Sequence, residues 1–353
     1  MSMEIRIYNR AMEFQGIIEN QRSLLWNRQH YEAGDFELHC PITPYNVSLL
    51  KMTNLVWKQG AVEAGVIENL HIEEDADGNE LVASGRFLPA YLDRRILPKM
   101  PGTNVPTAEA KMKAVANFPT FGLPIVIEPL QGFTENVKAE ARYKGALSTI
   151  MKIAKQAQLG FRIVPDFTAK TMTFCVYKGV DRSMGQSDRA RVIFSEGFSN
   201  LNKAVYEENE QVFANVCIVG GRGEGDERQT VTVGETELTG LDRREVFVNG
   251  QDISPDNITE EEYTAALEAR GWSKLAECAR YNSLECEAIP YGNFEYGVDY
   301  DLGDIVTIKK ESWDLGENLR MTGITEVYED GARKIQPVFG EPIPTTAKWE
   351  DDY

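Results

Sequence analysis

Cysteine and histidine are the side chains best suited to nucleophilic or metal chemistry, and this 353-residue chain has few of either. No cysteine stands in a C-x-x-C pair, and an odd number spread over the chain is no disulfide framework, so folding in a reducing cytoplasm is expected. No histidine lies at ligand spacing from a cysteine or another histidine, so we predict neither a zinc site nor a Cys–His or Ser–His–Asp nucleophile. The residues concerned are Cys40, Cys175, Cys217, Cys278, Cys286, His30, His39 and His71.

An acidic loop, EEDADGNE, could hold a calcium ion. Counted as an EF-hand loop from Glu73, it places Gly78 at the sixth position, but Ser84 stands where the twelfth position needs glutamate. No helices are expected on either side of it. We therefore predict a hairpin turn at Asp77-Gly78 and no metal site.

A glycine-rich run at 220–225 could cradle a phosphate group. Such a loop needs a helix to follow it, so that the first amide groups of the helix can hold the anion. The strand-like segment QTVTVG follows instead, and Glu224, Asp226 and Glu227 would repel a phosphate. We therefore predict a hairpin tip here.

The composition excludes several classes of protein. Asp and Glu total 55 against 37 Lys and Arg, a net charge of −18, so a protein that coats nucleic acid or adheres to an anionic membrane is not expected. No apolar run approaches the ~20 residues of a spanning helix, and the start, MSMEIRIYNR, is polar, so we expect neither membrane insertion nor a secretory leader. Because G-x-S-x-G, H-E-x-x-H and P-loop motifs are missing, we predict no enzyme, catalytic residue or cofactor, although a hydrolase with paired carboxylates stays open.

The elements that must carry any function are mostly strands, and we predict an α+β chain that is predominantly β. Residues 1–98 form the predicted N-terminal β-barrel domain. Leu24 and Trp26 share one face of a strand, and a turn at 32–35 leads into the next. In that next strand apolar and polar side chains alternate with period two. They are Phe36, Leu38 and Cys40 on one face, with Glu37 and His39 on the other.

A second predicted hairpin follows in the same domain. Val66, Leu70 and Ile72 are expected on one face of GVIENLHIEE, and LVASGR returns after the turn. Pro89 then opens a short helix, because proline is tolerated at a first helical position.

Residues 99–190 contain a proline-rich loop and a helical pattern as well as strands, and they are predicted as a mixed α/β domain between two barrels. The stretch PKMPGTNVPT reads as a loop, and KGALSTIMKIAKQAQLG as an amphipathic helix that stops at Gly160. A hairpin of FRIVPDF and TMTFCVYKG follows. The apolar face of the helix has the spacing i, i+3, i+4 and i+7. Its residues are Leu147, Ile150, Met151 and Ala154.

Residues 191–342 return to strands and are predicted as a C-terminal β-barrel domain with an inserted helix near 260–281. Thr259 and Glu262 form a capping box that starts this helix, which is expected to end near Tyr281. The strands expected in this domain are RVIFSEGF, VFANVCIVGG, SLECEAI, DIVTIKK, LRMTGITEVYE and KIQPVFG.

The two ends of the chain resemble each other faintly. Gly65-Val66-Ile67-Glu68 leads to a turn at Asp77-Gly78, and Gly323-Ile324-Thr325-Glu326 leads to one at Asp330-Gly331. Hairpins are common enough for chance to explain this, but both ends could also be versions of one barrel. The acidic, proline-rich tail at 343–353 is expected to be mobile or to dock elsewhere.

Motifs in a fixed order along the chain suggest a family. The chain resembles the siphovirus Gp thirty-seven-like tail-hub family, whose members are similar in fold to the baseplate hub of contractile phages. The resemblance spans about residues 5–340 and is weakest at 99–190. Its segments are Leu25-Trp26, 31–38, Gly65-Val66-Ile67-Glu68, Ser84-Gly85-Arg86, Arg94-Arg95-Ile96-Leu97, Gly220-Gly221 with Arg228, 300–306 and Phe339-Gly340.

The resemblance implies structural work. A family hub is a homotrimeric ring at the end of the tail tube in which each subunit offers two tube-like barrels, so that three copies imitate sixfold symmetry. It implies contacts with a distal tail protein, the tail tube, the tape measure protein and receptor-binding or other baseplate proteins. The chain is then expected at the virion's tail tip after synthesis in the cytoplasm of the host bacterium.

Three further hypotheses follow or stay open. If part of the negative charge lines the lumen, DNA would pass without specific binding, because contacts between phosphates and Lys or Arg hold DNA. A cell-wall (peptidoglycan) hydrolase would need two facing carboxylates in a cleft. A carbohydrate-binding receptor module would need an exposed aromatic platform.

Overall fold

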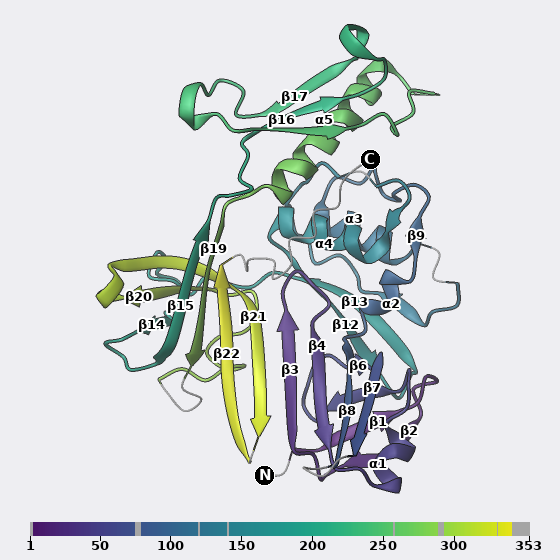
Figure 1. The fold of residues 1–353 in the computed structure, drawn as a ribbon, viewed down its shortest axis with the longest axis vertical. Coiled ribbons are helices and arrows are strands. Elements are labelled where there is room, and N and C mark those ends of the chain that lie inside the picture. Colours follow the sequence, from purple (N-terminus) through teal and green to yellow (C-terminus); the bar gives the residue numbers. More distant parts are fainter. Residues whose placement is uncertain are drawn as a thin grey trace.

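A computed structural model of the chain describes residues 3–74, 79–118, 121–139, 141–256, 258–288, 293–329 and 331–340. Its organising element is a ten-stranded sheet, with further layers on one side and smaller units above it (Figure 1). Five α-helices accompany the strands in these ranges, which agrees with the α+β, mainly β class predicted from the sequence.

Eight strands of the large sheet form one continuous antiparallel path. In spatial order they are β15 (Leu201–Asn209), β19 (Tyr281–Ala288), β22 (Ala332–Gly340), β21 (Leu315–Glu329), β3 (Ser23–Gln29), β4 (Asp35–Cys40), β8 (Asn79–Arg86) and β7 (Asn69–Glu74). Two short strands lie off this path, because β20 (Ile305–Lys310) pairs with β21 and β14 (Ile193–Ser195) pairs with β20. The alternation predicted at 36–40 is confirmed, with Phe36, Leu38 and Cys40 buried.

Pairing between β3 and β21 joins the two ends of the chain. The register runs from Ser23 opposite Glu329 to Gln29 opposite Gly323. The regions predicted as separate barrel domains, 1–98 and 191–342, therefore contribute to one sheet. Four strands of the path come from each region.

A second layer closes the N-terminal core. Its four-stranded sheet has the order β2 (Phe14–Ile18), β1 (Ile5–Tyr8), β5 (Leu55–Lys58), β6 (Gly65–Val66), and helix α1 (Pro44–Leu49) lies nearby. The prediction that Val66, Leu70 and Ile72 share a face was wrong. Val66 belongs to this second sheet, whereas Leu70 and Ile72 lie on edge strand β7, where Ile72 is 48% exposed.

The middle region packs helices over a small sheet. Its elements are α2 (Ala90–Asp93), β9 (Ile96–Leu97), α3 (Ala108–Ala116), β10 (Ile125–Ile127), β11 (Lys144–Gly145), α4 (Ala146–Ala157), β12 (Gly160–Asp166) and β13 (Thr171–Tyr177). The predicted hairpin of β12 and β13 is confirmed. The predicted stop of α4 at Gly160 was wrong, because Gln158 adopts the left-handed conformation at the helix end and Gly160 already begins β12. Pro89 precedes α2 as its cap.

A small subdomain is inserted between β15 and β19, and we call it the upper subdomain. Helix α5 (Glu260–Glu277) packs on a three-stranded sheet of β17 (Thr230–Gly234), β16 (Val216–Gly220) and β18 (Glu245–Asn249). The capping box of Thr259 and Glu262 is confirmed. The helix ends at Glu277, not near Tyr281, because Cys278 caps it and the chain must then extend into β19.

The upper subdomain touches the middle region through exposed ion pairs. They join Lys138 to Glu268 and Lys152 to Glu277, between the middle region and α5. Exposed pairs of this kind contribute about 0–1 kcal/mol each. The chain enters the subdomain after β15 and leaves it before β19. These two connections are adjacent, because Asn209 at the end of β15 pairs with Tyr281 at the start of β19.

A buried arginine lies where the two halves of the large sheet meet. Arg28 on β3 is 7% exposed and holds the Glu63 carboxylate with both Nε and Nη2, at 3.0 Å in each case. Its Nη1 donates to Asp301 at 3.0 Å and also to the Tyr296 hydroxyl. One guanidinium thus ties together the N-terminal half and the segment before β20.

A second buried ion pair crosses the same junction. Lys58 Nζ on β5 lies 2.7 Å from a Glu326 oxygen on β21, and Arg333 on β22 contacts the other oxygen at 3.0 Å. Burial alone would raise the pKa of the Glu326 carboxyl, but Lys58, helped by Tyr328 and Arg333, outweighs that effect and holds the pKa below its ordinary value. Lys58 and Glu326 are both nearly inaccessible, with side chains 8% and 5% exposed.

His30, which directly follows β3, fills a point where all three regions meet. Its backbone amide donates to Thr322, and its own carbonyl accepts from Phe161. The imidazole fits only because two glycines face it: a Cβ on Gly160 would lie 2.4 Å from its Nδ1, and one on Gly303 would lie 2.6 Å from its Cε1. Burial, with a smaller effect of Arg320, lowers the pKa of His30 to about 3.

The buried ion pair yields a test of stability. Replacing Glu326→Gln leaves Lys58 charged without its partner, so we expect a loss of about 3–5 kcal/mol in the free energy of unfolding, measured by urea denaturation. Adding Lys58→Met to that variant should recover most of the loss. The control Glu260→Gln breaks an exposed pair with Arg222 and should cost below about 1 kcal/mol. Equal losses in Glu326→Gln and Glu260→Gln would contradict this account.

His30 yields a test of pH dependence. Between about pH 6 and pH 4 the unfolded chain binds a proton at His30 and the folded chain does not, so unfolding should become easier by about 1.4 kcal/mol per pH unit from this residue. His30→Gln should remove that part of the slope. His39 is the opposite control, because the carboxylates of Glu37 and Glu80 raise its pKa despite partial burial. Its effect on the slope lies above about pH 6.5, so His39→Gln should leave the slope between pH 6 and pH 4 as in the parent. Parallel slopes for all three proteins would refute this.

Candidate functional site

The large sheet has one buried face and one open face. Side chains directly opposite each other on antiparallel strands point the same way, so the register divides the residues into two sets. The buried set includes Leu24, Trp26, Leu38, Ile324 and Phe339. In Figure 1 strands β3, β4, β21 and β22 run down the front of the molecule, and no helix is drawn over them.

The open face is polar and rich in carboxylates. Its centre carries neutral side chains, with Asn27 opposite Thr325 and Leu25 opposite Val327. Carboxylates flank this centre on both sides, and cations are fewer. The carboxylates are Asp35, Glu37, Glu73, Glu80, Glu207, Glu285 and Glu329, and the cations are Arg86 and Lys334, with His39 and His71 beside them. This face would attract no polyanion.

Both ends of the eight-strand path are open edges among the described residues. Strand β7 pairs only with β8, and β15 pairs only with β19. Unpaired strand edges readily accept another strand, so they are natural places for contact between copies. Because the path has an even number of alternating strands, β7 and β15 run in opposite directions, as an antiparallel pairing between rotated copies would require.

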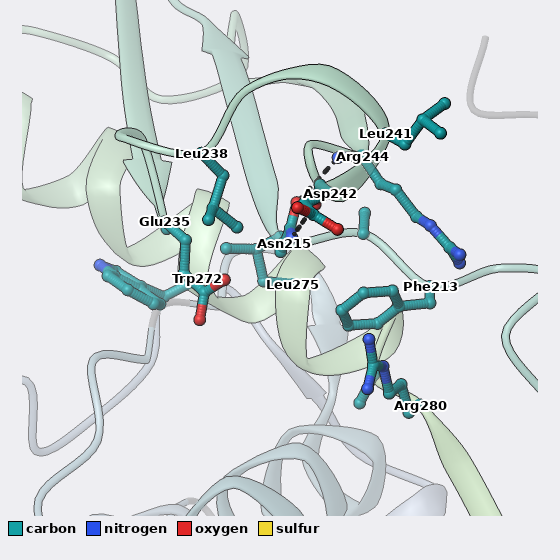
Figure 2. Close-up of a pocket in the computed structure, with 13 residues that line it drawn as sticks. Phe213, Asn215, Glu235, Leu238, Leu241, Asp242, Arg244, Trp272, Leu275 and Arg280 are labelled. Carbon is teal, nitrogen blue, oxygen red and sulfur yellow. Dashed lines mark hydrogen bonds between the residues drawn. The ribbon is translucent and has the colours of Figure 1, made fainter.

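An open pocket of about 750 Å³ lies at the base of the upper subdomain (Figure 2). Leu238, Leu241 and Trp272 line it with apolar surface, and Leu241 is 97% exposed. Arg244 and Arg280 both stack over the ring of Phe213, at 5.4 and 4.6 Å from its centroid. No local pattern predicts this pocket, because its residues come from three separate segments of the chain.

Neither the acidic loop at 73–80 nor the glycine-rich run at 220–225 forms a binding site for an ion or a phosphate among the described residues. The calcium-like loop falls partly at 75–78, outside the described residues, and pairing of β7 with β8 flanks it as a hairpin. The glycine-rich run joins β16 to β17, the predicted hairpin, with Gly220 opposite Thr230. Within the described ranges, no cluster of three or more His, Cys, Asp or Glu could hold a metal ion.

The histidines and cysteines lie apart in the fold. His39 contacts Glu37 and Glu80 on the open face, and His71 contacts Glu73. All five cysteines are buried and unpaired, and burial raises the pKa of the Cys40 thiol to about 12. A thiol so disfavoured as thiolate is a poor nucleophile. No helix in the described part is long and apolar enough to cross a membrane.

Similar solved structures share this fold over nearly the whole chain. The tail protein from Neisseria meningitidis MC58 aligns with a TM-score of 0.59 at 14% identity, covering 96% of each chain. The 43 kDa tail protein of prophage MuSo2 from Shewanella oneidensis gives 0.58 at 14% identity, covering 96% of this chain and 98% of that one. A chain of a Francisella PdpA–VgrG complex gives 0.50 at 10% identity, over 97% of this chain and 59% of that chain.

The family comparison covers the same extent. A search of curated proteins found no match. Residues 4–341, which include both halves of the large sheet and everything between them, match the family described as Siphovirus ReqiPepy6 Gp37-like protein. The resemblance drawn from the sequence motifs is thereby confirmed, and the chain belongs to the siphovirus ReqiPepy6 Gp37-like family, whose structural neighbours are phage tail proteins.

Proposed function

We propose that this phage tail protein forms the trimeric hub or tail-tip ring that continues the tail tube and lets DNA pass during infection. The observation that carries the proposal is the large sheet: it has a polar open face, a buried face and two unpaired edges. Open edges of a sheet readily accept another strand, and rotation of copies about one axis would bring β7 of one copy to β15 of the next. The role is structural, without catalysis.

The number and direction of the strands are compatible with a ring closed by three copies. Three eight-strand paths would make a ring of twenty-four strands, joined where β7 of one copy meets β15 of the next. The antiparallel pairing that joins β3 to β21 inside each chain would then be matched by antiparallel pairing of β7 with β15 between chains. Each half, 1–98 and 191–342, would then act as one of two tube-like domains around the insertion at 99–190, which supports the imitation of sixfold symmetry.

The open face would line the lumen in such a ring. Its carboxylates, including Glu37, Glu285 and Glu329, would repel the phosphate backbone, and the neutral centre offers few cations for it to bind. DNA would therefore slide through without specific contacts. The buried face would point outward, towards the second layer and the rest of the chain.

The same arrangement suggests partners and a location. A ring at the tail tip would contact the tail tube, the distal tail protein, the tape measure protein, and other baseplate or receptor-binding proteins. We place the protein in the virion after synthesis in the host cytoplasm. One similar chain comes from a complex of two proteins, PdpA and VgrG, which supports association with further components.

Ring closure can be tested by cross-linking in assembled tails. Val205→Cys on β15, combined with His71→Cys or Glu73→Cys on β7, puts a thiol on the open side of each free edge. Mild oxidation should produce covalent trimers and nothing larger, because a closed ring exhausts its edges. Each single variant is the control and should stay monomeric on a denaturing gel. A ladder beyond trimer, or no cross-link from either pair, would refute the ring.

Charge in the lumen can be tested by genome ejection in vitro. Phages that carry Glu37→Lys and Glu329→Lys should eject DNA more slowly than the parent, because phosphates would bind the new cations, and added salt should restore the rate. Phages with Glu224→Lys and Glu237→Lys, two exposed positions on the upper subdomain, should eject at the parental rate. Equal rates for all three phages would remove the lumen assignment.

A further inference from the structure

The upper subdomain has an apolar core of its own. Tyr263 and Leu267 of α5 pack there against Val219 and Val233 of the three-stranded sheet, and all four side chains are buried. This cluster is separate from the apolar core of the middle region, on which the subdomain rests. A unit with its own core can keep its internal structure while it moves as a whole.

The upper subdomain meets the middle region through polar contacts that all have the same direction of charge. In each of them the middle region supplies the cation and the upper subdomain supplies the oxygen. The contacts are Lys138 with Glu268 at 2.6 Å, Lys152 with Glu277 at 2.5 Å, and Arg142 with the Asp252 carbonyl at 3.4 Å. The lysine side chains are 56% and 52% exposed, so salt ions reach both pairs. Small polar interfaces of this kind permit motion between two units, whereas large apolar ones prevent it.

Two adjacent chain segments, 209–214 and 278–281, connect the upper subdomain to the large sheet (Figure 1), and we call them the stem. The carboxylate of Glu210 in the stem lies 2.9 Å from Arg280, on the other segment of the stem. It also lies 2.9 Å from Arg244, which belongs to the upper subdomain. The stem therefore holds the subdomain at one point, as a pivot would.

Open space lies beside this pivot. The pocket of about 750 Å³ is lined by Phe213 and Arg280 from the stem and by Leu238, Leu241 and Trp272 from the upper subdomain (Figure 2). The pocket thus separates the two units on this side of the pivot. A tilt of the subdomain here would close open space and would not have to displace packed side chains.

We propose that the upper subdomain turns about the stem as a rigid unit, and that the ion pairs of Lys138 and Lys152 with α5 are a latch that holds it against the middle region. Each exposed pair shifts the ratio of latched to open molecules by at most about fivefold, so the latch is weak. The Debye length falls from ~30 Å at 0.01 M salt to ~3 Å at 1 M, so salt should release the latch. The hinge lies within one chain and is independent of ring closure.

Distances between two spin labels test this hinge on the full chain, including the acidic tail at 343–353, which lies outside the described residues. Ala265→Cys on α5 with Ile72→Cys on β7 reports on the upper subdomain, and Leu130→Cys with Ile72→Cys is the control pair within the rest of the fold. All three sites are exposed, whereas the native cysteines are buried. Labelled chain is diluted into unlabelled chain, so that only distances within one molecule are measured.

The first pair of labels should give one distance at ~0.01 M salt and a second distance at ~1 M. Reversing the latch acids with Glu268→Lys and Glu277→Lys should raise the fraction of the second distance about tenfold at low salt. Adding Lys138→Glu and Lys152→Glu should restore the single distance. Glu260→Lys, on the same helix, breaks only a pair with Arg222 inside the subdomain and should change nothing.

Three results would overturn the hinge or its latch. A single, unchanged distance at ~1 M salt and in the variant with reversed acids would show a rigid subdomain. The same change in the control pair of labels would show that the whole fold loosens, which contradicts a hinge at the stem. A shift on reversing the acids that the added Lys138→Glu and Lys152→Glu do not restore would show that these ion pairs are not the latch.

Discussion

The pairing of β3 with β21 is the constraint on which the rest of the structure depends. It brings segment 23–29 beside segment 323–329 and turns two short sheets into one. The ion pairs of Arg28 with Asp301 and of Lys58 with Glu326 join the two halves, so they depend on this register. Ionic groups in such positions tolerate little displacement, so the junction specifies one alignment of the two halves where apolar packing alone would accept several.

The same register decides what each face of the sheet can do. A shift by one residue would turn Trp26 and Ile324 outward and carry Asn27 and Thr325 into the core. The sheet thus keeps a buried side that packs on the second layer and a polar side exposed to solvent, which would line the lumen of the proposed ring. The proposed role needs both faces: the buried face packs the sheet against the rest of the chain, and the polar face would offer DNA few groups to bind.

Local patterns in the sequence predicted most single elements correctly. Period-two alternation located Phe36, Leu38 and Cys40, and the capping box of Thr259 and Glu262 located the start of α5, because both signals lie within a few residues. Helix α3 was not predicted, since AEAKMKAVA has a weak apolar stripe and its stability comes from contact with α4. Pairing across ~300 residues leaves no local trace, so neither the shared sheet nor the pocket could be derived from spacing.

Several misassignments have the same origin in tertiary contacts. Gly160 is a glycine because the His30 imidazole occupies the space of its Cβ, and not because a helix ends there. Ile72 alternates like a core residue, yet its strand lies at the margin of the sheet. The family resemblance supplied what such patterns could not, namely that the two ends act together.

The upper subdomain joins the large sheet at the paired residues Asn209 and Tyr281, and this connection bears on how the protein can evolve. Because the two connecting strands are already neighbours, the inserted unit closes a loop whose ends the sheet holds together. Such a unit can be enlarged, trimmed or exchanged by recombination while the large sheet keeps the register of its strands. Diversification among related phages is therefore expected to concentrate in the upper subdomain, while the large sheet keeps its strand pairing.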